Sequence, residues 1–291
     1  MQTSWRAIAL RLRPPYDPPW PTVVMFPPDI FRDENITDNG SQTERQASYD
    51  LQQAGFLVFQ VETRLAPPGA LPNQSPSDKG YAPEQTDDGK RQILSALADI
   101  NCNGKIYLVG GSAGGTLALW CALDPASTVT GWNESARSHI KAVVSMSGPT
   151  DFCDLYSNPG GIPPNALTRF EMDLDNYVGL TYPADCDNDP DQKLNHASPY
   201  WLVTNGATSS PPPIRLYSTT GDRVPYSQAE DMFQALIAQY GMTFDVHRWL
   251  MDYAYGSTHE HAYKYWHAVN NDPFSDGLCV SQEVITFFKS H

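Results

Sequence analysis

The residues best suited to chemistry stand in a glycine-rich segment near the middle of the chain. Residues 106–109 form a short apolar run, which continues into Gly110-Gly111-Ser112-Ala113-Gly114 and then into a predicted apolar helix over residues 116–123. This is G-x-S-x-G between a strand and a helix, a pattern typical of a serine held on a sharp, strained turn with its hydroxyl exposed. Side chains two residues before or after the serine would collide with the adjoining strand and helix, and both positions are glycine. Ser112 is therefore the predicted nucleophile.

A phosphate-binding loop is the main alternative for such a glycine-rich turn. The spacing of Gly110 and Gly114 does not give G-x-G-x-x-G, and no lysine follows the turn as a P-loop requires. The nucleophile interpretation is therefore preferred.

A serine hydroxyl is a weak nucleophile unless an imidazole takes its proton and a carboxylate orients that imidazole. Asp222 directly follows a predicted strand at residues 213–217, and His259 and His261 follow the last predicted strand. Because catalytic groups gather at the carboxyl ends of parallel strands, we expect these side chains to meet at one edge of the sheet. The chain order Ser, Asp, His is typical of the α/β-hydrolases.

The segments that must position these residues alternate between strand and helix. We expect strands at residues 8–12, 22–26, 56–61, 106–109, 140–146, 213–217 and 244–250. Helices are expected at residues 41–54, 83–100, 116–123, 227–240 and 281–289. Such alternation predicts an α/β fold with a mostly parallel central sheet and helices on both faces.

One segment departs from this alternation, and it follows the strand after the nucleophile helix. Residues 152–200 are acidic and rich in turn residues, which predicts a cap-like insertion over the edge of the sheet. No linker divides the chain, so residues 1–291 are predicted to form a single domain.

Composition excludes several kinds of partner. The 291 residues include 19 basic and 33 acidic side chains, a net charge of −14, which argues against binding to nucleic acid or to an anionic membrane. No apolar run reaches the length of a membrane span. Arg6, Arg11 and Arg13 interrupt what would be the apolar core of a signal peptide, so the cytoplasm is the default prediction.

The cysteines do not indicate a disulfide framework. There are five, an odd number with no C-x-x-C, so neither a zinc site nor a complete set of disulfides is predicted. Cys153 and Cys186 could bridge across the insertion, but we do not predict that they do.

Several segments together resemble the hormone-sensitive-lipase-like esterases of the α/β-hydrolase fold. Val61-Glu-Thr-Arg64-Leu-Ala-Pro67 is similar to the Y-R-L-A-P stretch of that family, with Thr63 in place of tyrosine. Further similar segments are Pro83-Glu-Gln-Thr-Asp87-Asp88, Gly110-Gly-Ser112-Ala-Gly-Gly115, Ser147-Gly-Pro-Thr-Asp151 and Ala197-Ser-Pro199. The resemblance implies hydrolysis of a small-molecule ester without a cofactor or metal, with Ser112, Asp222 and a histidine as the triad. It leaves the oligomeric state open.

The resemblance also bears on which histidine is the base. His261-Ala262-Tyr263 is similar to the histidine–small–aromatic segment of the family, in which the small residue allows a tight turn into the next helix. His259 fits the Gly-x-x-His spacing from Gly256 but is followed by the bulky Glu260. His261 is preferred, and His259 is retained as the alternative.

The loop after the second predicted strand departs from the family pattern. Where the family has His-Gly-Gly-Gly, which helps to form the oxyanion hole, this chain has Phe26-Pro27-Pro28-Asp29-Ile30. The first oxyanion donor is expected to be the amide of Ala113, the residue after the nucleophile. Since proline has no N–H, the second donor is expected to be the amide of Asp29 or Ile30.

These observations predict a serine carboxylester hydrolase that cleaves short-chain esters through an acyl-enzyme. Tyr263 and Trp266 could line a compact acyl pocket, and an acidic insertion would disfavour anionic substrates. The acidic residues on which this rests are Glu171, Asp173, Asp175, Asp185, Asp187, Asp189 and Asp191. Two alternatives on the same fold are a sugar-ester deacetylase and a serine peptidase. A third is a catalytically inactive binding module, which the altered oxyanion loop would favour.

Overall fold

Seven strands form one sheet with the order β1-β3-β2-β4-β5-β6-β7. The computed structural model describes residues 8–28, 42–67, 79–160, 164–183, 186–206, 208–252 and 261–291. The strands are β1 (Ile8–Leu12), β2 (Trp20–Phe26), β3 (Leu57–Val61), β4 (Cys102–Gly111), β5 (Ile140–Met146), β6 (Ile214–Thr219) and β7 (Val246–Met251). β1 pairs antiparallel with β3, and all other pairs are parallel. The predicted α/β fold with a mostly parallel sheet is confirmed.

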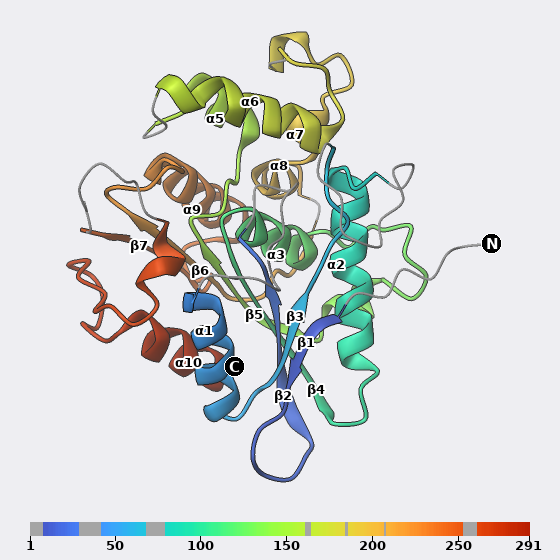
Figure 1. Cartoon of the computed structure of the whole chain (residues 1–291), viewed down its shortest axis with the longest axis vertical. Helices are drawn as coiled ribbons and strands as arrows, with labels where there is room; N and C mark the ends of the chain where they lie inside the picture. The colour runs from blue at the N-terminus through green and yellow to red at the C-terminus, as the bar shows by residue number, and fades with distance from the viewer. Residues whose placement is uncertain are drawn as a thin grey trace.

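The central strands are mostly apolar in the parts that lie between the two layers of helices, because both faces of the sheet are covered. Successive residues of β4 enter different cores: Leu108 lies in the larger one and Val109 in the smaller one. The larger core contains residues of α2 (Ala82–Leu97), α3 (Ala113–Leu123) and α9 (Tyr226–Tyr240). The smaller core contains residues of α1 (Gln42–Gln53) and α10 (Val280–Ser290), which lie together on the other face (Figure 1).

Element boundaries differ from the sequence predictions mainly at two places. The strand before Ser112 is longer than its apolar run, because its polar first residues continue the ladder from Cys102. The helix predicted to reach residue 100 ends at Leu97. The short elements that were not predicted include α4 (Glu134–Arg137), η1 (Cys186–Asn188) and η2 (Ala262–Tyr265). None of the helices within the described ranges is long and apolar enough to cross a membrane.

The insertion is helical, a secondary structure that the sequence analysis did not predict for residues 152–200. Its helices are α5 (Phe152–Ser157), α6 (Pro164–Val178), α7 (Lys193–His196) and the start of α8 (Pro199–Thr204). Leu174, Tyr177 and Val178 have the i, i+3, i+4 spacing of one helix face, and all three are buried in the larger core. Figure 1 shows α5, α6 and α7 grouped at the end of the molecule opposite the turn between β1 and β2.

Some acidic side chains of the insertion are buried and hold its structure together. Asp173, Asp175 and Asp189 are buried instead of facing solvent. Asp175 accepts a hydrogen bond from the hydroxyl of Tyr156, and Asp189 accepts one from the amide of Leu194 at 2.7 Å. These carboxylates fix the insertion internally, so they contribute less to the surface field than the sequence suggests.

A disulfide joins Cys153 in α5 to Cys186 in η1, with a Cα–Cα distance of 5.6 Å. The sequence did not lead us to predict it, because cysteine spacing alone does not define pairing. It closes a loop of 33 residues and so ties the start of the insertion to the segment that follows α6. The remaining cysteines, Cys102, Cys121 and Cys279, are free.

We expect thiol titration to reveal this disulfide directly. Ellman's reagent should detect three thiols in the unfolded, unreduced protein and all five after reduction. In the native protein Cys121 should not react, because burial raises the pKa of its thiol to about 12. Reduction should lower the free energy of unfolding by about 4 kcal/mol, the value expected for closing a loop of this length. Five reactive thiols without reductant would contradict the disulfide.

Candidate active site

Ser112 stands on the sharp turn between β4 and α3. Its φ of 48° lies in the left-handed region, which is costly for a residue with a side chain. The turn is fixed because the amide of Ser112 donates to the carbonyl of Met146 in β5 at 2.8 Å. The backbone therefore has the strained strand–turn–helix geometry that the G-x-S-x-G pattern predicts.

The two glycines of the pattern are required by close backbone contacts. A Cβ atom on Gly110 would lie 2.1 Å from the carbonyl oxygen of Gly114. A Cβ atom on Gly114 would lie 2.3 Å from the carbonyl oxygen of Phe26, at the end of β2. The steric reason given for the pattern is thus confirmed, and the second glycine also lets the loop after β2 approach the turn.

Asp222 and His261 are brought together although they are far apart in sequence. The Nδ1 atom of His261 lies 2.8 Å from the Oδ1 atom of Asp222, whose side chain is 1% exposed. Oδ1 also accepts the amide of Val224 at 3.0 Å, and Oδ2 accepts the hydroxyl of Ser147. These donors offset the cost of burying the carboxylate. With Nδ1 directed to Asp222, the tautomer favoured for a neutral His261 carries its proton there and leaves Nε2 as an acceptor.

The loop that carries His261 packs against the nucleophile turn. The ring of Tyr263 is stacked on the ring of His261, with centroids 5.5 Å apart. The same tyrosine covers Gly111, where an added Cβ would lie 2.5 Å from the tyrosine ring. Since Gly111 immediately precedes Ser112, Tyr263 connects the histidine loop with the strand that ends at the nucleophile.

Of the residues predicted to supply the oxyanion donors, Ala113 lies within the described part of the chain. Ala113 is the first residue of α3, and the first amides of a helix have no intrahelical acceptor. Asp29 and Ile30, the two candidates for the second donor, lie outside the described residues, and so does His259. Within the described ranges, no group of three or more His, Cys, Asp or Glu side chains is arranged to hold a metal ion.

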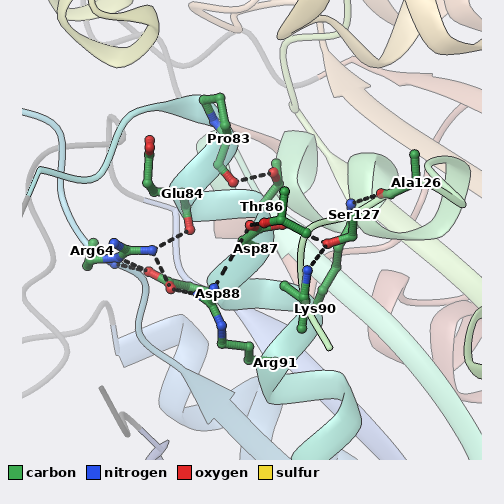
Figure 2. Close-up of polar contacts among 12 residues, drawn as sticks. Arg64, Pro83, Glu84, Thr86, Asp87, Asp88, Lys90, Arg91, Ala126 and Ser127 are labelled. Carbon is green, nitrogen blue, oxygen red and sulfur yellow. Dashed lines mark hydrogen bonds and ion pairs between the residues drawn. The ribbon is translucent and has the colours of Figure 1, made fainter. Parts of the chain in front are cut away.

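The segment that carried much of the sequence resemblance has a structural role in this protein. Arg64 follows β3, and its guanidinium donates to both oxygens of Asp88 in α2, at 2.9 and 3.0 Å (Figure 2). The amide of Arg64 also donates to Asp88, and Arg91 donates to the same carboxylate at 2.8 Å. Burial raises the pKa of Asp88, and the two arginines act in the opposite direction. This buried ion pair anchors the loop after β3 to α2.

A small apolar cavity of about 30 Å³ lies beside the nucleophile turn. It combines the end of β4, the end of β5, the loop after β2, and the histidine loop. Its lining residues are Met25, Phe26, Pro28, Ala47, Val109, Gly110, Gly111, Met146, Tyr263 and Trp266. The two aromatic residues that the sequence suggested for an acyl pocket therefore both line this cavity.

Several solved structures to which this chain is similar are esterases. An esterase B from Lactobacillus rhamnosis is 16% identical, with a TM-score of 0.64 over 94% of this chain and 76% of the other. A truncated carbohydrate esterase from gut microbiota is 17% identical, with a TM-score of 0.61 over 95% and 87% of the two chains. A thermophilic esterase from Thermogutta terrifontis is 16% identical, with a TM-score of 0.60 over 96% and 84%. Among curated proteins, none matches the sequence of this chain.

The sheet order, the strained serine turn and these similarities define the α/β-hydrolase fold, as the sequence resemblance implied. The family model named BD-FAE matches residues 34–236, well over half of the chain. The protein therefore belongs to the BD-FAE family of hydrolase-fold esterases.

Proposed function

We propose that this protein is a serine carboxylester hydrolase that works through an acyl-enzyme. The observation that supports this most is the 2.8 Å contact between Asp222 and His261, at the sheet edge where the strained turn holds Ser112. It also argues against the catalytically inactive binding module, because a buried carboxylate orienting an imidazole is what base catalysis requires. The serine peptidase alternative gains no support from any contact described above.

In the proposed reaction, Nε2 of His261 accepts the proton of the Ser112 hydroxyl as the oxygen attacks the ester carbonyl. The imidazolium that forms is stabilised by Asp222 and then protonates the departing alcohol. Water, deprotonated by the same histidine, hydrolyses the acyl-enzyme and releases the acid. The negative oxygen of each tetrahedral intermediate is bound by the amide of Ala113 and by the amide of Asp29 or Ile30.

The class of bond cleaved can be tested with matched chromogenic substrates. p-Nitrophenyl acetate should give a burst of p-nitrophenol, and the corresponding p-nitroanilide should give no measurable release. Faster cleavage of the anilide would instead indicate a peptidase.

The small volume of the cavity beside the nucleophile turn supports a preference for substrates with a short acyl group. A single water needs about 10–15 Å³ on this measure of volume, so a cavity of about 30 Å³ accepts a group of roughly one or two heavy atoms. We propose that the methyl end of an acetyl group occupies it. The Thermogutta terrifontis esterase, which shares the fold, binds propionate and butyrate, which are also short acyl groups.

We expect kcat/KM to be highest for p-nitrophenyl acetate and to fall at least about tenfold by the octanoate, because a longer chain would overfill the cavity. Met146→Val should widen the cavity and move the preference towards butyrate. Met251→Val is the matched control, because Met251 is buried in the same core but does not line the cavity. Equal or greater kcat/KM on the octanoate in the unmodified protein would contradict this assignment.

A sugar-ester deacetylase is the second candidate, and two observations favour it. The cavity fits the methyl end of an acetyl group, and the solved structures with a similar fold include a carbohydrate esterase. Acetate release from acetylated xylan, compared with release from p-nitrophenyl acetate at equal acetyl concentration, separates a sugar esterase from a general esterase.

We further propose an oxidising compartment for this protein in place of the cytoplasmic default. Disulfides persist in oxidising environments and are rare in the cytosol. The bond between Cys153 and Cys186 supports this proposal. We propose no nucleic-acid or membrane partner, in keeping with the acidic composition.

A further inference from the structure

The turn that follows β5 lies between the strands that lead to Ser112 and Asp222. In the sheet, β5 is flanked by β4 on one side and by β6 on the other. The carbonyl of Met146, the last residue of β5, accepts the amide of Ser112 at 2.8 Å. The amide of the next residue, Ser147, donates to the carbonyl of Tyr217 in β6 at 2.7 Å. This turn is therefore held to both neighbouring strands.

The side chain of Ser147 extends these contacts to the acid and to the histidine loop. Its hydroxyl is hydrogen-bonded to Oδ2 of Asp222, the oxygen that does not contact His261. The same hydroxyl lies 2.6 Å from the amide nitrogen of Ala262, the residue directly after His261. Ser147 is only 2% exposed, so water does not compete freely for these contacts.

The direction of both hydrogen bonds follows from the chemistry of the groups. A backbone amide can only donate, so the Ser147 oxygen accepts from Ala262. The single hydroxyl proton is then available for Asp222, whose ionised oxygen can only accept. One hydroxyl thus fixes the free oxygen of the acid and the backbone beside the base at the same time.

The backbone conformation of Ser147 supports a use for its side chain. Among the described residues, only Ser112, Ser147 and Gln192 have positive φ without being glycine. The φ of Ser147 is 58°, a conformation that costs roughly 1 kcal/mol or more for a residue with a Cβ and little for glycine. A serine at such a position keeps a hydroxyl where the backbone alone would favour glycine.

We propose that Ser147 is a positioning residue of the active site. It acts through Asp222 and through the backbone of the histidine loop, and does not contact the substrate. By fixing Oδ2, it directs Oδ1 of Asp222 at the imidazole of His261 and so keeps Nε2 in place for proton transfer. This inference rests on the proposed serine hydrolase function.

The test compares Ser147→Ala and Ser147→Gly with a matched control, Ser198→Ala. Ser198 is 1% exposed, and its hydroxyl also accepts one amide, from Phe152 at 2.9 Å, and donates to one oxygen, of Leu194 at 2.7 Å. The control therefore also loses one accepted and one donated hydrogen bond, with the donated bond going to a backbone carbonyl within the insertion. The glycine variant tolerates positive φ, so it is expected to fold even where alanine is destabilised.

We expect both Ser147 variants to lower kcat for p-nitrophenyl acetate by about 10- to 100-fold, the effect of losing a hydrogen bond to a charged group. KM should change by no more than about twofold, because Ser147 does not touch the substrate. The control should keep kcat within about twofold while losing a comparable amount of thermal stability. In proton NMR, the downfield Nδ1–H signal of His261 should shift or broaden in the Ser147 variants and remain unchanged in the control.

The proposal is overturned if Ser147→Gly retains kcat within about twofold of the unmodified protein, or if it loses no more activity than Ser198→Ala. An unchanged Nδ1–H signal in the Ser147 variants would also overturn it. If the proposed serine hydrolase function is wrong, Ser112→Ala will be as active as the unmodified protein, a result that the Ser147 variants do not affect. The NMR comparison uses the resting protein, so it decides the role of Ser147 in that case as well.

Discussion

Ser112→Ala is expected to lower kcat for p-nitrophenyl acetate by about four orders of magnitude or more. The change removes one oxygen atom, and with it the only atom that can form the proposed acyl-enzyme at this turn. Residual hydrolysis would come from oxyanion stabilisation and substrate binding alone. Initial rates at saturating substrate, measured with enough enzyme to detect a loss of this size, provide the comparison.

The variant should remain folded, so its loss of activity can be interpreted. Alanine retains the Cβ that the strained backbone already accommodates, and the amide that bonds to Met146 is unaffected. The melting temperature should therefore stay within a few degrees of that of the unmodified protein. Retention of a tenth of the original kcat by a folded Ser112→Ala protein would show that the serine mechanism is wrong.

His261→Ala is expected to have the second-largest effect, a fall in kcat of roughly 10³- to 10⁴-fold. Without the imidazole, no group accepts the serine proton, and the leaving alcohol is not protonated. Asp222→Asn should have an effect of similar order, because an amide that donates to Nδ1 would favour the wrong tautomer. The same ester assay and an unfolding curve for each variant are the measurements.

Two control variants separate the base from other histidines. His267→Ala removes a histidine that is 55% exposed and paired with Asp50, so kcat should remain close to that of the unmodified protein. His259→Ala should keep most of the activity if His261 is the base. A large loss in His259→Ala together with an active His261→Ala would reverse this assignment.

The nucleophile turn was predictable because its determinants are local. The glycines at positions 110 and 114, the apolar strand and the apolar helix all lie within a few residues of Ser112. The structure bears out the steric reason for the two glycines. The alternation of strands and helices was predictable for the same reason, since each element shows its own periodicity. Asp222 could be selected because it follows a strand in the expected chain order, and the structure places it against His261.

Two features that depend on distant partners were not predicted from this sequence, the contacts of Ser147 and the disulfide. Ser147 is separated from Asp222 by 75 residues and from Ala262 by 115, and on its own it resembles any serine after a strand. The disulfide between Cys153 and Cys186 likewise depends on how the insertion folds back on itself.

The helices of the insertion were not predicted, because acidic residues interrupt the apolar pattern of their buried faces. The acidic residues Asp173 and Asp175 lie beside Leu174 in α6, and all three are buried. Sequence reasoning assigns such carboxylates to a solvated face, because burying a charge is costly without partners. Asp175 accepts a hydrogen bond from the hydroxyl of Tyr156. Tyr156 lies outside the helix of Asp175, and the sequence does not reveal that the two residues meet.

The most direct test of the central claim is to identify the atom that becomes acylated or phosphonylated. A fluorophosphonate probe, followed by proteolysis and tandem mass spectrometry, should give one adduct per chain, on the peptide that contains Ser112. Labelling should be absent in Ser112→Ala and much slower in His261→Ala, because the imidazole activates the serine oxygen. An adduct on a different residue, or continued ester hydrolysis by protein that carries no adduct at saturating probe, would contradict the account.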